Sequence, residues 1–198
     1  MKFCFLTTLL LQFSLNYGQA TYNFKLNQSY PVPSKKTICL NSNNCLFFKR
    51  DKTFSYLLLY HSNSGFKRNA LRIIDSVDVT PYTSRVYCFC SDIDKKEFVV
   101  LWETAYESLS CILAYYLKGN QLFKIGDLKI SLNCKTCEYF GYPIKSICIK
   151  KVDDNIEFSF LEDLNFWKSG SEEEMFKVGK FKYQFNIKQK NLKIITNK

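Results

Sequence analysis

Hydrophobic and polar residues alternate along much of the chain, and short polar runs interrupt the alternation. Successive side chains of a β-strand point to opposite faces, so a period of two predicts strands. Runs rich in Asn, Ser, Gly, Pro and Asp between them predict turns. Many short strands at this spacing predict an all-β fold, either an antiparallel β-barrel or, as the alternative, a β-sandwich. The predicted strands are residues 54–62, 71–79, 84–90, 97–102, 123–132, 146–152, 156–161 and 181–187.

Two segments carry the end signals of a helix. Residues 171–178 begin with a serine suited to an N-cap and have a glutamate three residues later, which predicts one short C-terminal helix before the last strand. Residues 104–119 hold a similar pair, Thr104 and Glu107. The apolar and aromatic residues that follow also suit a strand, so we interpret this segment as a turn at 104–109 followed by a strand.

Residues 1–20 have the composition of a secretory signal peptide. Lys2 precedes a long apolar stretch, and the small residues Gly18 and Ala20 stand where a signal peptidase cuts. We therefore expect a secreted, extracellular protein in which residues 21–198 form a single β-rich domain. No later segment has the roughly 18 consecutive apolar residues of a transmembrane helix, so no membrane span is expected.

Cysteine usage and one sequon agree with that compartment. Eight cysteines follow the signal segment, and an even number in a secreted chain predicts four disulfides whose pairing the sequence does not determine. The Cys-x-x-Cys at 134–137 lacks the strand-to-helix setting of a redox site, and the spacings do not fit zinc. Asn27-Gln28-Ser29 predicts a glycan on Asn27. We expect disulfides, and no metal, at Cys39, Cys45, Cys88, Cys90, Cys111, Cys134, Cys137 and Cys148.

Catalytic motifs are missing from the sequence. His61 is the single histidine, so a Ser–His–Asp or Cys–His arrangement would depend on that one residue. No glycine-rich phosphate loop, H-E-x-x-H or G-x-S-x-G motif occurs. Carboxylate pairs such as Glu103 with Glu107, or Glu157 with Glu162, arise readily by chance in a chain with 18 acids. We therefore expect a protein that is not an enzyme and that has no cofactor.

One region of the chain resembles a known family. The stretch "CSDIDKKEFVVLWE", residues 90–103, resembles the lipocalin segment in which an Asp-bearing turn joins two strands. The stretch "SCILAYYLKGN", residues 110–120, resembles the next lipocalin strand. The Gly-x-Trp motif that opens most lipocalins does not occur, so the resemblance is to divergent arthropod and parasite members. It implies an eight-stranded cup that carries or sequesters a small hydrophobic or amine ligand.

The strand at residues 97–102 has two apolar faces, so we expect it to be buried on both sides, with one side lining the cup. At its end, Glu103 is suited to pair with an amine ligand. The residues alone favour the other interpretation, in which Trp102 belongs to the core and Glu103 lies in water at the rim. The predicted ligand-binding residues are Tyr87, Phe89, Phe98, Val100, Trp102, Glu103 and Tyr115.

The charge distribution suggests a second kind of partner. Lys and Arg outnumber Asp and Glu by 28 to 18, and residues 177–198 contain lysines but no acid. A basic surface at Lys182, Lys188 and Lys190 would suit an anionic glycan or a partner protein. Because residues 153–174 are rich in acids, pairing between the two segments would instead cancel these charges. We expect no nucleic-acid partner, since the predicted compartment and the motifs argue against one.

Overall fold

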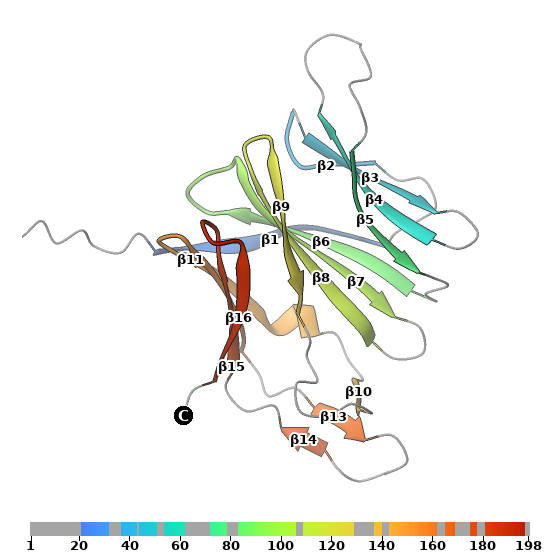
Figure 1. The fold of residues 1–198 in the computed structure, drawn as a ribbon, viewed down its shortest axis with the longest axis vertical. Coiled ribbons are helices and arrows are strands. Elements are labelled where there is room, and N and C mark those ends of the chain that lie inside the picture. The colour runs from blue at the N-terminus through green and yellow to red at the C-terminus, as the bar shows by residue number, and fades with distance from the viewer. Residues whose placement is uncertain are drawn as a thin grey trace, which may run out of the picture.

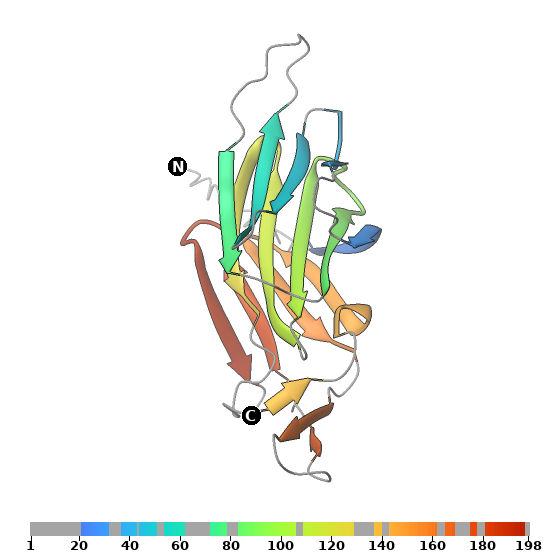
Figure 2. The ribbon, with the colours of Figure 1, turned by 90° about the vertical axis from the view of Figure 1, so that its right-hand side faces the viewer.

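The structure is a computed structural model of the chain. It describes residues 21–31, 37–42, 44–50, 54–61, 72–78, 83–105, 109–128, 137–139, 143–161, 165–168, 175–177 and 181–196. Within these ranges nearly every element is a β-strand, and the strands form antiparallel sheets of nine, four and three strands (Figure 1, Figure 2). The predicted signal peptide lies outside the described residues.

The largest sheet coils into a nearly closed barrel. Its strand order is β16-β15-β12-β11-β1-β6-β7-β8-β9. The first third of the chain, in β1, therefore meets the last third, in β11, at the middle of the sheet. The edge strands β9 and β16 approach each other at Gly126, where a side-chain carbon would lie 3.2 Å from Cδ2 of Leu192. The strands are β1 (Thr21–Pro31), β6 (Thr83–Ser91), β7 (Glu97–Ala105), β8 (Leu109–Lys118), β9 (Gln121–Asp127), β11 (Ile147–Val152), β12 (Asn155–Phe160), β15 (Phe181–Asn186) and β16 (Asn191–Thr196).

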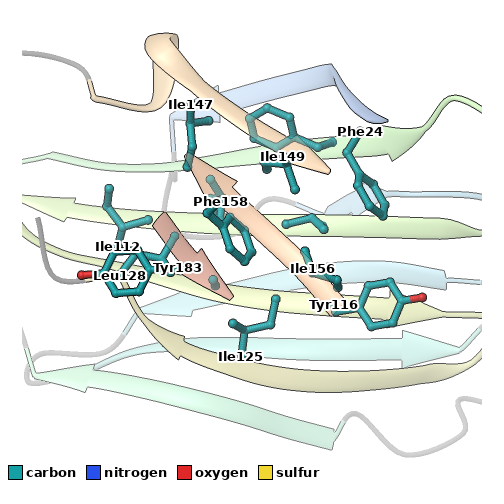
Figure 3. Packing of buried hydrophobic residues seen from close by; sticks show 14 of the residues in the cluster. Phe24, Ile112, Tyr116, Ile125, Leu128, Ile147, Ile149, Ile156, Phe158 and Tyr183 are labelled. Carbon is teal, nitrogen blue, oxygen red and sulfur yellow. The ribbon is translucent and has the colours of Figure 1, made fainter. Parts of the chain in front are cut away.

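Alternation along these strands places one set of apolar side chains inside the barrel. Val99 and Leu101 of β7 meet Ile156 and Phe158 of β12 in one cluster of buried residues, which Figure 3 shows from close by. A short 3₁₀ turn, η1 (Pro143–Ser146), adds the buried side chain of Ile144 to the same cluster. The barrel interior is therefore packed with protein side chains.

A four-stranded sheet covers part of the outer face of the barrel. Leu46 and Leu57 from this sheet pack against the side chains of β6, β7 and β8 that point outward, among them Cys88, Val100 and Trp102. β7 is consequently buried on both faces, as its two apolar faces predict. The sheet has the order β2-β3-β4-β5, with β2 (Thr37–Cys39), β3 (Asn44–Arg50), β4 (Phe54–His61) and β5 (Arg72–Asp78).

The smallest sheet corrects the predicted helix. It consists of β10 (Cys137–Tyr139), β13 (Asn165–Lys168) and β14 (Met175–Lys177), in the order β10-β13-β14. Three residues of the segment 171–178 thus form a strand, and the other five lie outside the described residues. Phe176 lies opposite Phe166 in the antiparallel ladder, so the backbone of this part of the segment belongs to a sheet and not to a helix.

The predicted all-β antiparallel barrel is confirmed. Each of the eight predicted strands overlaps a strand of the structure, and the segment after residue 104 contains β8 and no helix among its described residues. Seven strands were not predicted, namely β1, β2, β3, β10, β13, β14 and β16. Among the residues that the structure describes, no helix is long and apolar enough to cross a membrane.

Candidate functional site

Two glutamates of β7 lie on the interior face of the barrel. Glu97 starts the strand and Glu103 lies near its end, and both share the face of Val99 and Leu101. Six residues of extended chain separate them by about 20 Å. Both side chains are nearly inaccessible, with 3% of Glu97 and 8% of Glu103 exposed. Because burying a carboxylate is costly without partners, the partners of each decide what it does.

Glu97 lies in a compact polar cluster with Lys151, Tyr22 and Tyr116, called the Glu97 cluster below. The ammonium of Lys151 donates to Oε1 of Glu97 at 2.9 Å and to Oε2 at 3.0 Å, and it also donates to the Tyr116 hydroxyl at 3.2 Å. The Tyr22 hydroxyl donates to Oε2 of Glu97. The ammonium also lies 5.1 Å from the centre of the Tyr22 ring and 5.6 Å from that of Tyr116.

The partners in the Glu97 cluster balance its charges. Burial alone would raise the pKa of Glu97, but hydrogen bonds from Tyr22 and Lys151, together with the Lys151 charge, hold that pKa below its ordinary value. Burial and the neighbouring Glu97 raise the pKa of Tyr22 and Tyr116, so both phenols stay neutral donors. A carboxylate with a buried ammonium and a phenol already bound has little need of a ligand, so this cluster stabilises the fold.

Glu103 has fewer partners. Its Oε2 accepts a hydrogen bond from the Tyr87 hydroxyl at 2.9 Å, and Arg85, which lies opposite it on β6, contributes a positive charge. Burial nevertheless outweighs both effects and raises the pKa of Glu103 above its ordinary value. Burial and the Glu103 charge likewise raise the pKa of Tyr87. Glu103 is therefore an incompletely compensated carboxylate in an apolar wall.

The predicted ligand-binding residues do not form one surface. Tyr87, Phe89 and Glu103 point into the barrel interior. Phe98, Val100, Trp102 and Tyr115 point the other way and are buried under the four-stranded sheet. Apart from Glu103, both sets are apolar or aromatic, so alternation identified two buried faces without showing which of them faces the interior. Trp102 is a core residue, while Glu103 is buried and does not lie in water at a rim.

Sequence reasoning missed the cations that accompany the two glutamates. Lys151 follows Ile147 and Ile149 at a spacing of two, so the alternation of β11 places it on the interior face. Arg85 shares a face with Tyr87 in the same way. A basic residue in phase with the apolar positions of a strand was the signal that could have identified both.

One predicted disulfide is confirmed. Cys39 and Cys45 lie opposite each other on β2 and β3 and are bonded. The structure corrects the four-bridge prediction in part, since Cys88, Cys90 and Cys148 are free thiols. Cys88 lies among apolar side chains between two sheets, and burial raises its pKa to about 12, so it behaves as an inert core residue. The side chains of three further cysteines lie outside the described residues, namely those of Cys111, Cys134 and Cys137.

The C-terminal lysines are largely engaged by acids or rings of the protein itself. Lys182 forms an ion pair with Glu157 at 2.9 Å across the β12–β15 ladder, and Lys188 pairs with Asp154 at 2.7 Å. The ammonium of Lys190 lies 5.8 Å from the centre of the Phe123 ring. Acids of residues 153–174 thus neutralise lysines of residues 177–198, which is the alternative to a glycan-binding surface that the charge distribution allowed.

Potential metal ligands do not gather in the part of the chain that the structure describes, where no group of three or more His, Cys, Asp or Glu side chains is suitably placed. Comparison of the chain with protein-family models, curated proteins and solved structures found no match. The functional argument therefore depends on the site itself, and the contrast between Glu97 and Glu103 is its most informative feature.

Proposed function

We propose that this chain is a secreted binding protein that carries or sequesters a small apolar amine, with Glu103 inside the barrel as the anchor for the ammonium. One observation carries the proposal: the burial of Glu103 is only partly offset by its hydrogen bond from Tyr87 and by the charge of Arg85. An incompletely compensated ionisable group in a protected site is a typical feature of a functional site.

A ligand ammonium would supply what Glu103 lacks. The carboxylate can accept several hydrogen bonds. Among the described residues, Tyr87 is the one side chain seen to donate a hydrogen bond to it. A charge-assisted hydrogen bond from an ammonium contributes about 1.5–3 kcal/mol. Glu97 already has such a bond from Lys151, which is why the proposal concerns Glu103 and not Glu97.

The surroundings of Glu103 favour a compact apolar ligand. On β8 its direct neighbour is Ile112, which is fully buried, and Leu128 donates a backbone hydrogen bond to the carbonyl of Ile112 at 2.9 Å. Aliphatic and aromatic side chains occupy the barrel interior, so a large lipid would have to displace many of them. A short alkyl or aryl amine needs to displace only a few.

Export of the protein is part of the proposal. The signal-like segment at residues 1–20 supports it, and the disulfide between Cys39 and Cys45 is compatible with an oxidising compartment. A basic surface for an anionic glycan is the weaker second candidate, because Lys182 and Lys188 already pair with acids of the chain.

Titration calorimetry of the protein purified from the medium of secreting cells tests the ligand proposal. The probes are butylamine and 2-phenylethylamine, each with its matching alcohol as the uncharged control. We expect the amines to bind and the alcohols to bind at least tenfold more weakly, because they lack the ammonium.

Two variants locate the anchor. Glu103→Gln keeps the size of the side chain and removes its charge, so amine affinity should fall about ten- to 100-fold. Glu157→Gln makes the same change on the outer face, where Glu157 contacts Lys182 and Gln184, and should leave amine affinity unchanged. Equal affinity of the wild-type protein and a folded Glu103→Gln variant for every amine would refute the proposal.

A further inference from the structure

A positive and a negative side chain lie opposite each other in the barrel wall. Arg85 of β6 is the direct cross-strand partner of Glu103 of β7. Arg85 shares its face of β6 with Tyr87, whose hydroxyl donates to Glu103 at 2.9 Å. Directly opposite residues of an antiparallel pair have Cβ atoms about 4.5–5.5 Å apart. The guanidinium, the phenol and the carboxylate therefore form one group, called the Arg85–Glu103 site below.

The members of the Arg85–Glu103 site differ in their contact with water. Arg85 is exposed, whereas Tyr87 and Glu103 are buried. On the other side of Glu103, its direct neighbour is Ile112 of β8, which is fully buried. A row across three strands thus leads from an accessible cation, through a buried carboxylate, to an apolar side chain. A ligand bound along this row would have its charged end at Arg85 and Glu103 and its apolar end at Ile112.

Arg85 can do more than compensate the charge of Glu103. A guanidinium has five N–H donors in a planar fork, and it binds a carboxylate through two parallel hydrogen bonds. Because Arg85 is exposed, a ligand can reach these donors from the solvent. A lysine would offer only a point charge, so an arginine at this position suits a planar anion such as a carboxylate.

The charge balance of the Arg85–Glu103 site favours a ligand that carries both signs. An amine without an anion would gain a partner in Glu103, but it would also bring its ammonium close to the Arg85 charge. Like charges repel strongly where water is scarce. A zwitterion avoids this conflict, because its ammonium can bind Glu103 while its carboxylate binds Arg85. Each ionised group then has an opposite partner, and the net charge of the site is unchanged.

We propose that the ligand of the Arg85–Glu103 site is a free α-amino acid with an apolar side chain, and that Arg85 selects it over simple amines. The inference rests on the amine-binding function proposed above and names the class of ligand within it. An α-amino acid carries its ammonium and its carboxylate on one carbon, so it can present them together to two directly opposite residues. Its side chain then extends from the same carbon toward Ile112 and the apolar interior.

Titration calorimetry of the secreted protein with three ligands of one shape tests the inference. L-Phenylalanine carries both charges, 2-phenylethylamine carries only the ammonium, and 3-phenylpropanoate carries only the carboxylate. We expect L-phenylalanine to bind at least tenfold more tightly than 2-phenylethylamine, because the bidentate contact with Arg85 is added. 3-Phenylpropanoate should bind most weakly, because it offers Glu103 no ammonium.

Substitution of Arg85 locates the source of this preference. In Arg85→Gln, L-phenylalanine should bind no more tightly than 2-phenylethylamine, because the partner of the carboxylate is gone. Arg85→Lys keeps the charge and removes the fork, so it should reduce the preference and serves if Arg85→Gln does not fold. Lys150→Gln removes a cation from an exposed position on the outer face of β11 and should leave the preference at its wild-type value.

The outcomes separate this inference from the proposed function. Wild-type protein that binds 2-phenylethylamine but binds L-phenylalanine no more tightly would overturn the amino-acid ligand and leave the amine-binding function standing. Protein that binds neither compound would overturn both. A preference for L-phenylalanine that is unchanged in a folded Arg85 variant would overturn the role of Arg85, and 3-phenylpropanoate binding as tightly as L-phenylalanine would overturn the pairing with Glu103.

Discussion

The Glu97 cluster offers a quantitative test of the fold. In the variant Glu97→Gln, the ammonium of Lys151 loses a carboxylate that it contacts at 2.9 and 3.0 Å. Lys151 is 7% exposed, so water cannot replace the lost partner without local opening. Lys118, whose contact with the same carboxylate is 3.5 Å long, loses that partner too and as a second cation cannot compensate the charge of Lys151. Removing one partner of a buried ion pair costs about 3–5 kcal/mol.

That loss is a large part of the free energy of unfolding, which is about 5–15 kcal/mol for a typical domain. Urea unfolding of the wild-type protein and the variant, followed by tryptophan fluorescence, measures the difference directly. The double variant Glu97→Leu/Lys151→Met replaces both charges with apolar side chains of similar size. It should be much less destabilised than Glu97→Gln, because no charge remains buried alone.

The comparison with the double variant distinguishes the loss of an ion pair from a general sensitivity of this region to substitution. A loss below about 1 kcal/mol for Glu97→Gln would show that the pair is exposed to water in solution. The stability that the double variant loses can also be compared with the losses in Glu97→Leu and Lys151→Met alone. A loss equal to the sum of these two would show that the side chains act independently. Either result would refute the description of the cluster as a buried, balanced group.

Three further predictions concern the barrel. Trp102→Ala empties a fully buried site between two sheets and should cost about 3–5 kcal/mol in urea unfolding. Gly126→Ala places a Cβ at φ +137° and 3.2 Å from Cδ2 of Leu192, and should lower stability by about 1–3 kcal/mol in the same assay. The stabilising contribution of Glu103, whose folded pKa is raised, is fully present below pH 4.5 and is lost as pH rises through that pKa. Glu103→Gln should therefore gain stability relative to the wild-type protein between pH 4 and pH 7, and an equal difference at both pH values would contradict the buried carboxylate.

The sequence predicted the strands of the barrel centre well and its first and last strands poorly. β6 and β7 are runs of β-branched and aromatic residues that are buried on both faces, which makes their signal strong. β1 and β16 also alternate, as at Tyr22 and Phe24 or at Leu192 and Ile194, but their few apolar residues are separated by Lys, Asn and Gln, and this weaker signal was overlooked. β1 owes its place to pairing with β6 and β11, which are distant in sequence and which local patterns do not contain, whereas β16 pairs with β15, its neighbour along the chain.

The site was predicted in part for a related reason. Glu103 was identified because a carboxylate follows an apolar strand, but Lys151 and Arg85 come from other parts of the chain. Whether a buried glutamate is compensated depends on which cation the fold brings beside it. Glu97 and Glu103 have the same spacing from the centre of the apolar run, yet Lys151 contacts only the first.

Cysteine counting shows a similar limit. An even number predicts bridges, but a bridge requires Cα atoms within about 7 Å and suitable side-chain directions. Cys39 and Cys45 meet this requirement because β2 and β3 pair directly, with Cα atoms 4.0 Å apart. Cys88 instead fills part of the core between two sheets, a use of cysteine as a small apolar residue that the count does not predict.

The most direct test of the proposed function is the titration of Glu103 itself, followed by ¹³C NMR of carboxyl-labelled glutamate, with Glu103→Gln used to assign the signal. In the free protein the Glu103 carboxyl should titrate above the ordinary pKa of 4.5. Saturation with a bound amine should lower that pKa, because the ammonium stabilises the carboxylate. A carboxyl that titrates at or below 4.5 in the free protein, and that no amine shifts, would contradict the account.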